Sequence, residues 1–200
     1  MIAKQKDGVD MKIGVLALQG AVAEHIRSLE RAGAQGVAVK HTDQLDELDG
    51  LILPGGESTT IGKLMRKYGF IEAVRDFAGR GKPIFGTCAG LILLAARLEG
   101  GEEPHLGLMD MTVARNAFGR QRESFETELD VKGLDSPLRA VFIRAPLIKE
   151  VGPQVEVLAT YKGEIVAARQ GNLLASSFHP ELTDDVRMHG LLLDMARQAK

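Results

Sequence analysis

Short, almost entirely apolar segments recur through the first half of the chain, with room for a helix between most of them. They are KIGVLAL (12–18), GVAVK (36–40), GLILP (50–54) and PIFGT (83–87). Segments this short and this apolar are typical of strands buried on both faces, which are the strands of parallel sheets. Helical patterns follow them, such as AGLILLAARL (89–98), so the order of the elements indicates βαβ units.

The second half of the chain shows strand-like segments that follow one another without long helices between them. These segments are MTVAR (111–115), SFETELDV (124–131), AVFIRAP (140–146), VEVLATY (155–161), EIVAARQ (164–170) and LLASSF (173–178). Glycine, proline or charged turns separate them, which favours antiparallel pairing. A last helix is expected from Asp184 onward. We therefore predict an α/β fold with three layers: a mostly parallel central sheet with flanking helices, and additional antiparallel strands in the second half.

Length and composition set limits on the kind of protein. With 200 residues and no linker or repeat, we expect residues 11–200 to form a single domain. The opening MIAKQKDGVD precedes a second methionine and lacks the apolar core of a signal peptide, so we interpret residues 1–10 as an N-terminal extension or an expression remnant. A net charge of −2 gives no basic surface for nucleic acid or an anionic membrane. The single cysteine excludes an internal disulfide and fits a reducing cytoplasm.

That cysteine, Cys88, stands in the pattern Gly86-Thr87-Cys88-Ala89-Gly90 between a predicted strand and a predicted helix. A nucleophile on a sharp strand-to-helix turn has strained backbone angles and close neighbours, which glycines two residues away on each side accommodate. The N-terminus of the following helix favours a thiolate, and the Ala89 N–H would face an oxyanion formed on the substrate. The alternative is that Cys88 is a small buried hydrophobic residue, the usual role of a lone cysteine.

A cysteine nucleophile needs a histidine and a group that orients it, and His179-Pro180-Glu181 offers both. In an extended segment, residues two apart project to the same side, so Glu181 can hold one ring nitrogen while the other faces the thiol. The alternative is a strand-ending turn with a solvated histidine and glutamate. The remaining histidines are expected at the surface or in helix packing (His25 and His189) or in loops (His41 and His105).

The segment Pro54-Gly55-Gly56 ends another predicted parallel strand. Two glycines let the backbone approach a ligand closely, so the N–H groups near Gly56 are candidates for the second half of an oxyanion hole. A simple strand-to-helix turn is an equally good interpretation of this segment alone. Phosphate binding is a further alternative, although no Walker lysine pattern is present.

Together these residues resemble the class I (triad) glutamine amidotransferases, and most closely the glutaminase subunits of pyridoxal 5′-phosphate synthase (the PdxT/SNO family). The resemblance is carried by LALQGAVAEH (16–25), LILPGGESTT (51–60), GTCAGLILLA (86–95), HLGLMDMTVARNAFGRQ (105–121), FIRAP (142–146) and SFHPEL (177–182). It implies Cys88 as nucleophile, His179 as acid and base, and Glu181 as the residue that orients His179. It also implies a set of glutamine-binding residues: Gly56, Glu57, Ser58, Arg115, Ile143 and Arg144.

The resemblance further implies what the chain does and with which partner. The expected reaction is hydrolysis of L-glutamine to glutamate and ammonia through a γ-glutamyl thioester, without a cofactor or a metal. The expected partner is a (β/α)₈-barrel synthase subunit in a large heteromeric complex, which receives the ammonia. A Gly55–Gly56 peptide that completes the oxyanion hole only in the complex would explain a glutaminase that is nearly silent alone. We accordingly expect the chain to be classed both as a hydrolase and as a lyase.

Three other functions remain compatible with parts of this pattern. A cysteine hydrolase of the intracellular-peptidase type shares the parallel sheet and the cysteine elbow, but it does not predict His-Pro-Glu after the last strand. A non-catalytic binding module on the same fold has no need of all three triad groups. A glutaminase that serves another synthase, such as imidazole glycerol phosphate synthase, would have identical chemistry, so only the family-specific segments separate it from our interpretation.

Overall fold

The computed structural model describes residues 11–115, 117 and 124–200. Our interpretation of residues 1–10 as an extension lies outside these residues. Among the helices of the described part, none combines the length and the apolar character that crossing a membrane would require.

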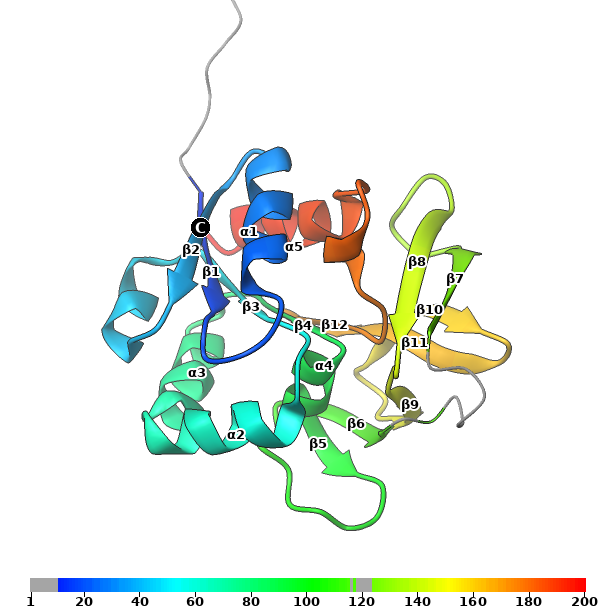
Figure 1. Ribbon diagram of the computed structural model, residues 1–200, viewed down its shortest axis with the longest axis horizontal. Coiled ribbons are helices and arrows are strands. Elements are labelled where there is room, and N and C mark those ends of the chain that lie inside the picture. The colour runs from blue at the N-terminus through cyan, green and yellow to red at the C-terminus, as the bar shows by residue number, and fades with distance from the viewer. Residues whose placement is uncertain (1–10, 116, 118–123) are drawn as a thin grey trace, which may run out of the picture.

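A parallel sheet forms the centre of the fold, as the apolar segments predict (Figure 1). Its strands run in the order β2-β1-β3-β4-β12, and every neighbouring pair is parallel. Their bounds are β1 (Lys12–Leu16), β2 (Gln35–Val39), β3 (Gly50–Leu53), β4 (Ile84–Thr87) and β12 (Leu173–Ser176). The carboxyl ends of parallel strands meet at one edge of a sheet, which is where α/β proteins bind ligands.

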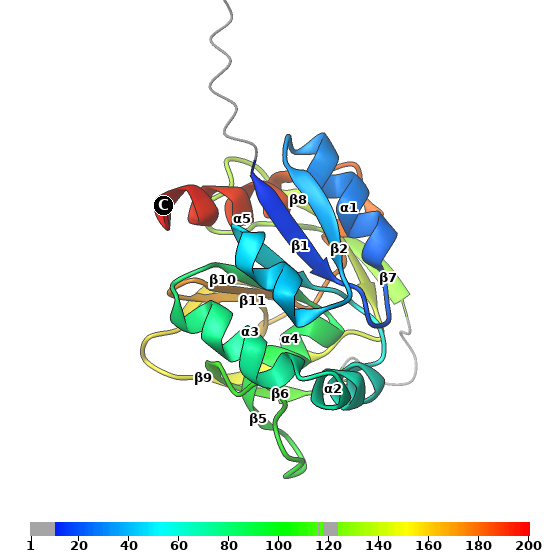
Figure 2. The ribbon, with the colours of Figure 1, turned by 90° about the vertical axis from the view of Figure 1, so that its left-hand side faces the viewer.

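Helices cover both faces of this sheet, because successive apolar side chains of a strand point to opposite faces. Leu51 and Leu53 of β3 belong to one core cluster, whereas Ile52 between them belongs to the other. The first cluster packs under α2 (Ser58–Lys67), α3 (Phe70–Gly79) and α4 (Ala89–Leu94), and the second under α1 (Val22–Arg31) and α5 (Arg187–Gln198). Figures 1 and 2 show these two helical layers on opposite sides of the sheet. The predicted three-layer arrangement is confirmed.

Additional strands extend the sheet beyond β12. Strand β11 is antiparallel to β12, β9 and β10, and β9 is antiparallel to β6. At the far edge β5 pairs with β6 in parallel. Their bounds are β5 (Ala95–Leu98), β6 (Met109–Ala114), β9 (Leu147–Val151), β10 (Glu156–Tyr161) and β11 (Glu164–Gln170). The expectation of antiparallel strands in the second half is therefore confirmed.

Strands β7 (Ser124–Leu129) and β8 (Leu138–Ile143) form a separate antiparallel hairpin instead of joining the main sheet. The inner face of this hairpin is apolar and packs in the same cluster as α1 and α5. Phe142 of β8 stacks on Phe125 with ring centroids 4.7 Å apart and meets Phe178 edge-on at 5.7 Å. These aromatic contacts fix the hairpin beside the segment that follows β12.

Two boundaries differ from the sequence-based expectation. The helix expected over 89–98 ends at Leu94, and residues 95–98 form β5 because they pair with β6. The last helix begins at Arg187, not at Asp184, because the Asp185 carboxylate accepts a hydrogen bond from the Arg187 N–H at 3.0 Å and so precedes the helix. Short 3₁₀ helices complete the chain, η1 (Thr42–Glu47) and η2 (Pro180–Leu182).

Candidate active site

Cys88 occupies a strained turn between β4 and α4. Its φ of 49° and ψ of −103° lie in a region that residues with a side chain rarely adopt. The two flanking glycines are required by space. A Cβ on Gly86 would lie 2.5 Å from the carbonyl oxygen of Gly90, and a Cβ on Gly90 would overlap the carbonyl of Leu53 in β3. The turn therefore has the geometry that the sequence pattern predicts, with the sulfur at the carboxyl end of a parallel strand.

His179 and Glu181 lie together beside this turn. The Nδ1 atom of His179 is 2.7 Å from Oε1 of Glu181, and both residues are buried. Their contact arises in a different way from the one expected, because Glu181 lies in the 3₁₀ helix η2 and not in an extended segment. The backbone N–H of His179 donates to the carbonyl of Val141 in β8 at 2.8 Å, which ties the histidine to the separate hairpin.

The electrostatics of this pair favour a charged histidine. Burial by itself would lower the pKa of His179, but the side chains of Cys88 and Glu181 raise it to about 10. Burial would likewise raise the pKa of Glu181, yet the hydrogen bond from His179 holds it below its ordinary value. The imidazolium therefore lies close enough to Cys88 for the two side chains to interact. The Nε2 atom of His179 has no hydrogen-bond partner among the described residues.

A cavity of about 430 Å³ opens in front of the sulfur. It gathers residues from five separate segments of the chain, and every glutamine-binding residue implied by the resemblance lies in its wall. The lining residues are Gly56, Glu57, Ser58, Cys88, Ala89, Ile92, Arg115, Ile143, Arg144 and His179. Glu181 stands behind His179, outside this wall. The volume suits a small polar molecule of the size of an amino acid.

The glycine turn after β3 forms one side of the cavity. The carbonyl of Gly55 accepts a hydrogen bond from Ala21 N–H at 3.0 Å, and the N–H of Glu57 donates to Oε1 of Gln19 at 2.8 Å. Because a trans peptide is planar, the N–H of Gly56 points to the opposite side from Ala21. A Cβ on Gly55 would lie 2.7 Å from Cε1 of His179, so this turn also packs directly against the histidine.

Glu57 fixes the start of α2. Its carboxylate accepts hydrogen bonds from the N–H groups of Thr59 and Thr60 at 3.1 and 2.7 Å. Hydrogen bonds from the side chain and backbone of Thr60 lower the pKa of Glu57 to about 2. The sequence pattern suggests that the hydroxyl residues 58–60 cap this helix, whereas the glutamate before them does so.

The two arginines of the cavity differ in how they are held. Arg115 pairs with Glu102 at 2.9 Å and donates to Oγ1 of Thr59 at 3.1 Å, which keeps its guanidinium near the start of α2. Arg144 has a positive φ of 44°, a strained conformation directly after β8. The carbonyl of Ile143 lies 3.9 Å from the sulfur of Cys88. The segment 143–144 therefore reaches the nucleophile through its backbone.

Sequence reasoning missed some residues of this region and misplaced others. Ile92 lines the cavity, and its position four residues after Cys88 on α4 is a helical spacing that could have revealed it. Gln19 holds the glycine turn from a loop far away in sequence, which no local pattern indicates. His25 and His189 are fully buried behind Glu181 and contact each other, so of the two positions expected for them, surface or helix packing, the structure shows helix packing.

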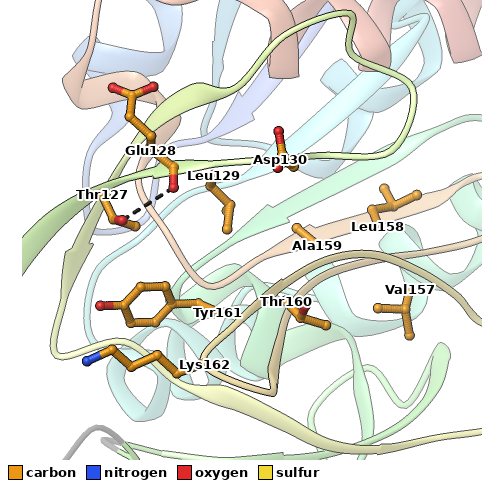
Figure 3. Close-up of a pocket in the computed structure, with 10 residues that line it drawn as sticks. All are labelled: Thr127, Glu128, Leu129, Asp130, Val157, Leu158, Ala159, Thr160, Tyr161 and Lys162. Atoms are coloured by element: carbon orange, nitrogen blue, oxygen red, sulfur yellow. Dashed lines mark hydrogen bonds between the residues drawn. The ribbon is translucent and has the colours of Figure 1, made fainter.

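A second cavity of about 490 Å³ lies between the end of β7 and strand β10 (Figure 3). Thr127 and Leu129 lie on the side that faces Tyr161, whereas the Glu128 side chain points the other way, and none of the residues that line the cavity is a cysteine or a histidine. Within the described residues, no group of three or more histidine, cysteine or acidic side chains is placed to hold a metal ion. The cavity at Cys88 is therefore the candidate active site.

A three-layer α/β fold that carries a cysteine elbow and a buried histidine–glutamate pair beside a glycine turn is the arrangement expected of a glutamine amidotransferase. Comparison with known families gives the particular one: residues 15–198 match the model of the SNO glutamine amidotransferase family. The chain belongs to this family.

Individual relatives agree over nearly the whole chain. A "Pyridoxal 5'-phosphate synthase subunit PdxT" from Niallia circulans is 72% identical over 190 residues, covering 95% of this chain and 100% of the relative. A protein of the same name from Geobacillus sp. (strain WCH70) is 66% identical and covers 95% of this chain and 99% of the relative. A crystal structure of a glutamine amidotransferase superposes with a TM-score of 0.89 at 51% identity, covering 92% of this chain and 98% of the other.

These findings correct one expectation. The chain is not to be classed as a lyase in addition to a hydrolase, because the family it matches is one of glutamine amidotransferases and its role is glutamine hydrolysis. A lyase activity belongs to the synthase subunit, which is a different chain.

Proposed function

We propose that this chain is the glutaminase subunit of a pyridoxal 5′-phosphate synthase and hydrolyses L-glutamine to glutamate and ammonia. The observation that carries the proposal is the single cavity that brings Cys88, His179 and the glycine turn together. Relatives that are 64 to 72% identical over 95% of this chain bear the name of that synthase subunit and support the assignment.

Cys88, His179 and Glu181 act as a triad in the proposed mechanism. The thiolate of Cys88 attacks the side-chain amide carbon of glutamine, and the C–N bond breaks as His179 gives its proton to the leaving ammonia. A γ-glutamyl thioester remains on Cys88. His179 then takes a proton from water, which attacks the thioester, releases glutamate and regenerates the thiolate. Glu181 holds the ring of His179 in place throughout and stabilises its positive charge whenever the ring is protonated.

The remaining residues of the cavity bind and polarise the substrate. The N–H groups of Gly56 and Ala89 stabilise the oxyanion of each tetrahedral intermediate. Arg115 or Arg144 pairs with the α-carboxylate of glutamine, since a guanidinium binds a carboxylate through two hydrogen bonds. Glu57, Ser58 and Ile143 complete the glutamine site, as the resemblance to triad amidotransferases implies.

The proposed partner is a (β/α)₈-barrel synthase subunit in a large heteromeric complex. Free ammonia is mostly ammonium at neutral pH and is then a poor nucleophile, so direct transfer to the synthase has a chemical advantage. We further propose that docking gates the reaction through the Gly55–Gly56 peptide, whose hydrogen bond to Ala21 would break if the peptide turned over.

No cofactor or metal takes part in the proposed reaction, and residues 11–200 act as one domain. We propose a cytoplasmic location, because a reducing compartment keeps a cysteine nucleophile free of disulfides.

The other functions considered at the sequence level have less support. A peptidase of the same fold class does not account for the histidine–glutamate pair after β12 or for the glycine turn. A binding module does not account for the strained turn at Cys88. The names of the relatives favour pyridoxal 5′-phosphate synthase over another synthase as the enzyme that receives the ammonia.

The test is glutamate release from L-glutamine by the purified chain, alone and mixed with the barrel synthase subunit. We expect activity to rise sharply on mixing and to vanish in Cys88→Ala. His105→Leu is the matched control, because His105 is a buried histidine outside the cavity, and we expect it to retain activity. Strong activity that the synthase does not change would refute the partner and the gating. No glutamate release under either condition would refute the function itself.

A further inference from the structure

The far side of the Glu181 carboxylate is occupied by a second histidine. Oxygen Oε1 of Glu181 faces His179, and the other oxygen, Oε2, lies 3.5 Å from Nε2 of His25. The side chains of His25 and Glu181 have no exposed surface at all. A buried carboxylate needs donors for both oxygens, because an unpartnered charged oxygen away from water is strongly unfavourable. His25 is the group placed to supply the second donor.

His25 is itself held by two further contacts. Its Nδ1 lies 2.9 Å from Nε2 of His189 in α5, and its Nε2 lies 3.1 Å from Oγ1 of Thr87, the residue before Cys88. The ring therefore joins α1, α5, the end of β4 and the triad carboxylate in one buried cluster. The charged groups that face the cluster are Glu181 and His179, with Glu24 and Arg31 on α1.

The position of the protons in this cluster follows from its charges. Burial lowers the pKa of both His25 and His189, so both rings are neutral and each carries a single N–H. If the His25 proton were on Nδ1, the bare Nε2 lone pair would face an anionic carboxylate, which is repulsive. The proton is therefore on Nε2, directed at Oε2 of Glu181 and Oγ1 of Thr87. His189 then donates its own Nε2–H to Nδ1 of His25 and fixes this tautomer.

We propose that His25 is a positioning residue of the triad: its Nε2–H holds the far oxygen of Glu181 and so keeps the carboxylate turned toward His179. The proposal rests on the proposed glutaminase function and deepens it. Oε2 has no hydrogen-bond partner among the described residues, so the 3.5 Å contact with His25 is what restrains it. Without that contact the carboxylate can rotate away from Nδ1 of His179. The imidazolium would then lose its orientation and its counter-charge, both of which the acid and base steps require.

The test compares His25→Leu, which keeps volume but removes the donor, with His25→Gln, whose amide N–H₂ reaches the place of Nε2. Glutaminase kinetics are measured in the complex with the synthase subunit, and the pKa of His179 is measured by NMR on histidine-labelled chain. For His25→Leu we expect kcat to fall about tenfold with KM for glutamine unchanged, the size expected for losing a hydrogen bond to a charged group. The pKa of His179 should fall as well, and His25→Gln should restore most of both values.

His105→Leu serves as the control for loss of a buried histidine, and we expect wild-type kcat and an unchanged pKa of His179. A His25→Leu chain with wild-type kcat would overturn the proposal, and so would a loss of kcat in both variants without any change in the pKa of His179. If His25→Leu fails to fold, His25→Gln decides: near-normal kcat and pKa support the proposal, and a loss of kcat overturns it. Failure of wild-type chain to release glutamate would instead refute the proposed function, and the NMR measurement separates the two cases.

Discussion

Replacing Gly86 by alanine tests whether the close approach of α4 to β4 holds the nucleophile in place. The added methyl carbon would lie 2.5 Å from the carbonyl oxygen of Gly90, 2.6 Å from its carbonyl carbon and 2.8 Å from Cδ1 of Leu94. Non-bonded heavy atoms prefer separations of about 3.5 Å or more, so β4 and the start of α4 have to move apart by about 1 Å. Two of the three atoms are backbone, which cannot turn aside as a side chain can.

The expected magnitudes follow from that displacement. Overpacking a buried position costs about 1–3 kcal/mol, and a backbone clash belongs at the upper end of this range. For a domain of this size each kcal/mol lowers Tm by about 2–4 °C, so Gly86→Ala should lower Tm by about 6–12 °C. A 1 Å displacement of Cys88 and the Ala89 N–H should also reduce glutaminase activity by about 10²-fold.

The assay combines thermal unfolding with glutamate release in the complex, and Gly190→Ala is the matched control. Gly190 lies inside α5, and an added Cβ there meets nothing within 4 Å. The same chemical change should therefore stabilise the chain by about 0.5–1 kcal/mol at that position. A Gly86→Ala chain with the Tm and activity of the wild type would show that our account of the elbow is wrong.

Two further predictions concern the residues around the triad. In Gly55→Ala the new Cβ would lie 2.7 Å from Cε1 of His179, so we expect glutamate release in the complex to fall at least about tenfold. Urea denaturation should show that the chain still folds, and unchanged activity would contradict the prediction. Burial lowers the pKa of His189 to about 3, well below its value in the unfolded chain. The unfolded state therefore binds the extra proton, and stability should fall as pH falls from 6.5 toward 3. Over the 1.5 pH units from 6.5 to 5 the loss is about 2 kcal/mol at 1.36 kcal/mol per unit. Urea midpoints at both pH values should show it, and a His189→Gln chain with the same pH dependence would contradict it.

The parallel part of the fold could be predicted from the sequence because its strands are buried on both faces. Segments such as 50–54 and 83–87 have no other stable environment, and the structure places both in the central sheet. The pairing of the later strands could not be predicted. Strands β7 and β8 alternate between buried and exposed residues, whereas β11 is buried through its middle, but neither pattern specifies a pairing partner. Their separation into two sheets depends on aromatic contacts between distant residues, such as Phe142 with Phe178.

For the site, the sequence predicted those contacts that join residues close to each other in the chain. Cys88 with its two glycines and the pair His179 and Glu181 followed from residues within two positions of each other, and the structure brings them together. Their catalytic roles stay predictions. The contact of Gln19 with Glu57 joins residues 38 positions apart, and no pattern in either segment predicts it.

His25 shows a different limit of sequence reasoning. It shares a helical face with Val22 and Leu29, so burial was detectable from the spacing. Which group meets it inside could not be known, because Glu181 reaches it only through the packing of α1 on the last 3₁₀ helix.

The contact between His25 and His189 joins positions 164 residues apart, one in the first helix and the other in α5. During synthesis the ribosome releases α1 and the elbow well before α5 has emerged. A nascent chain therefore holds Cys88 while the network behind Glu181 is still incomplete. The buried cluster around His25 is therefore among the last contacts that a newly made chain can form.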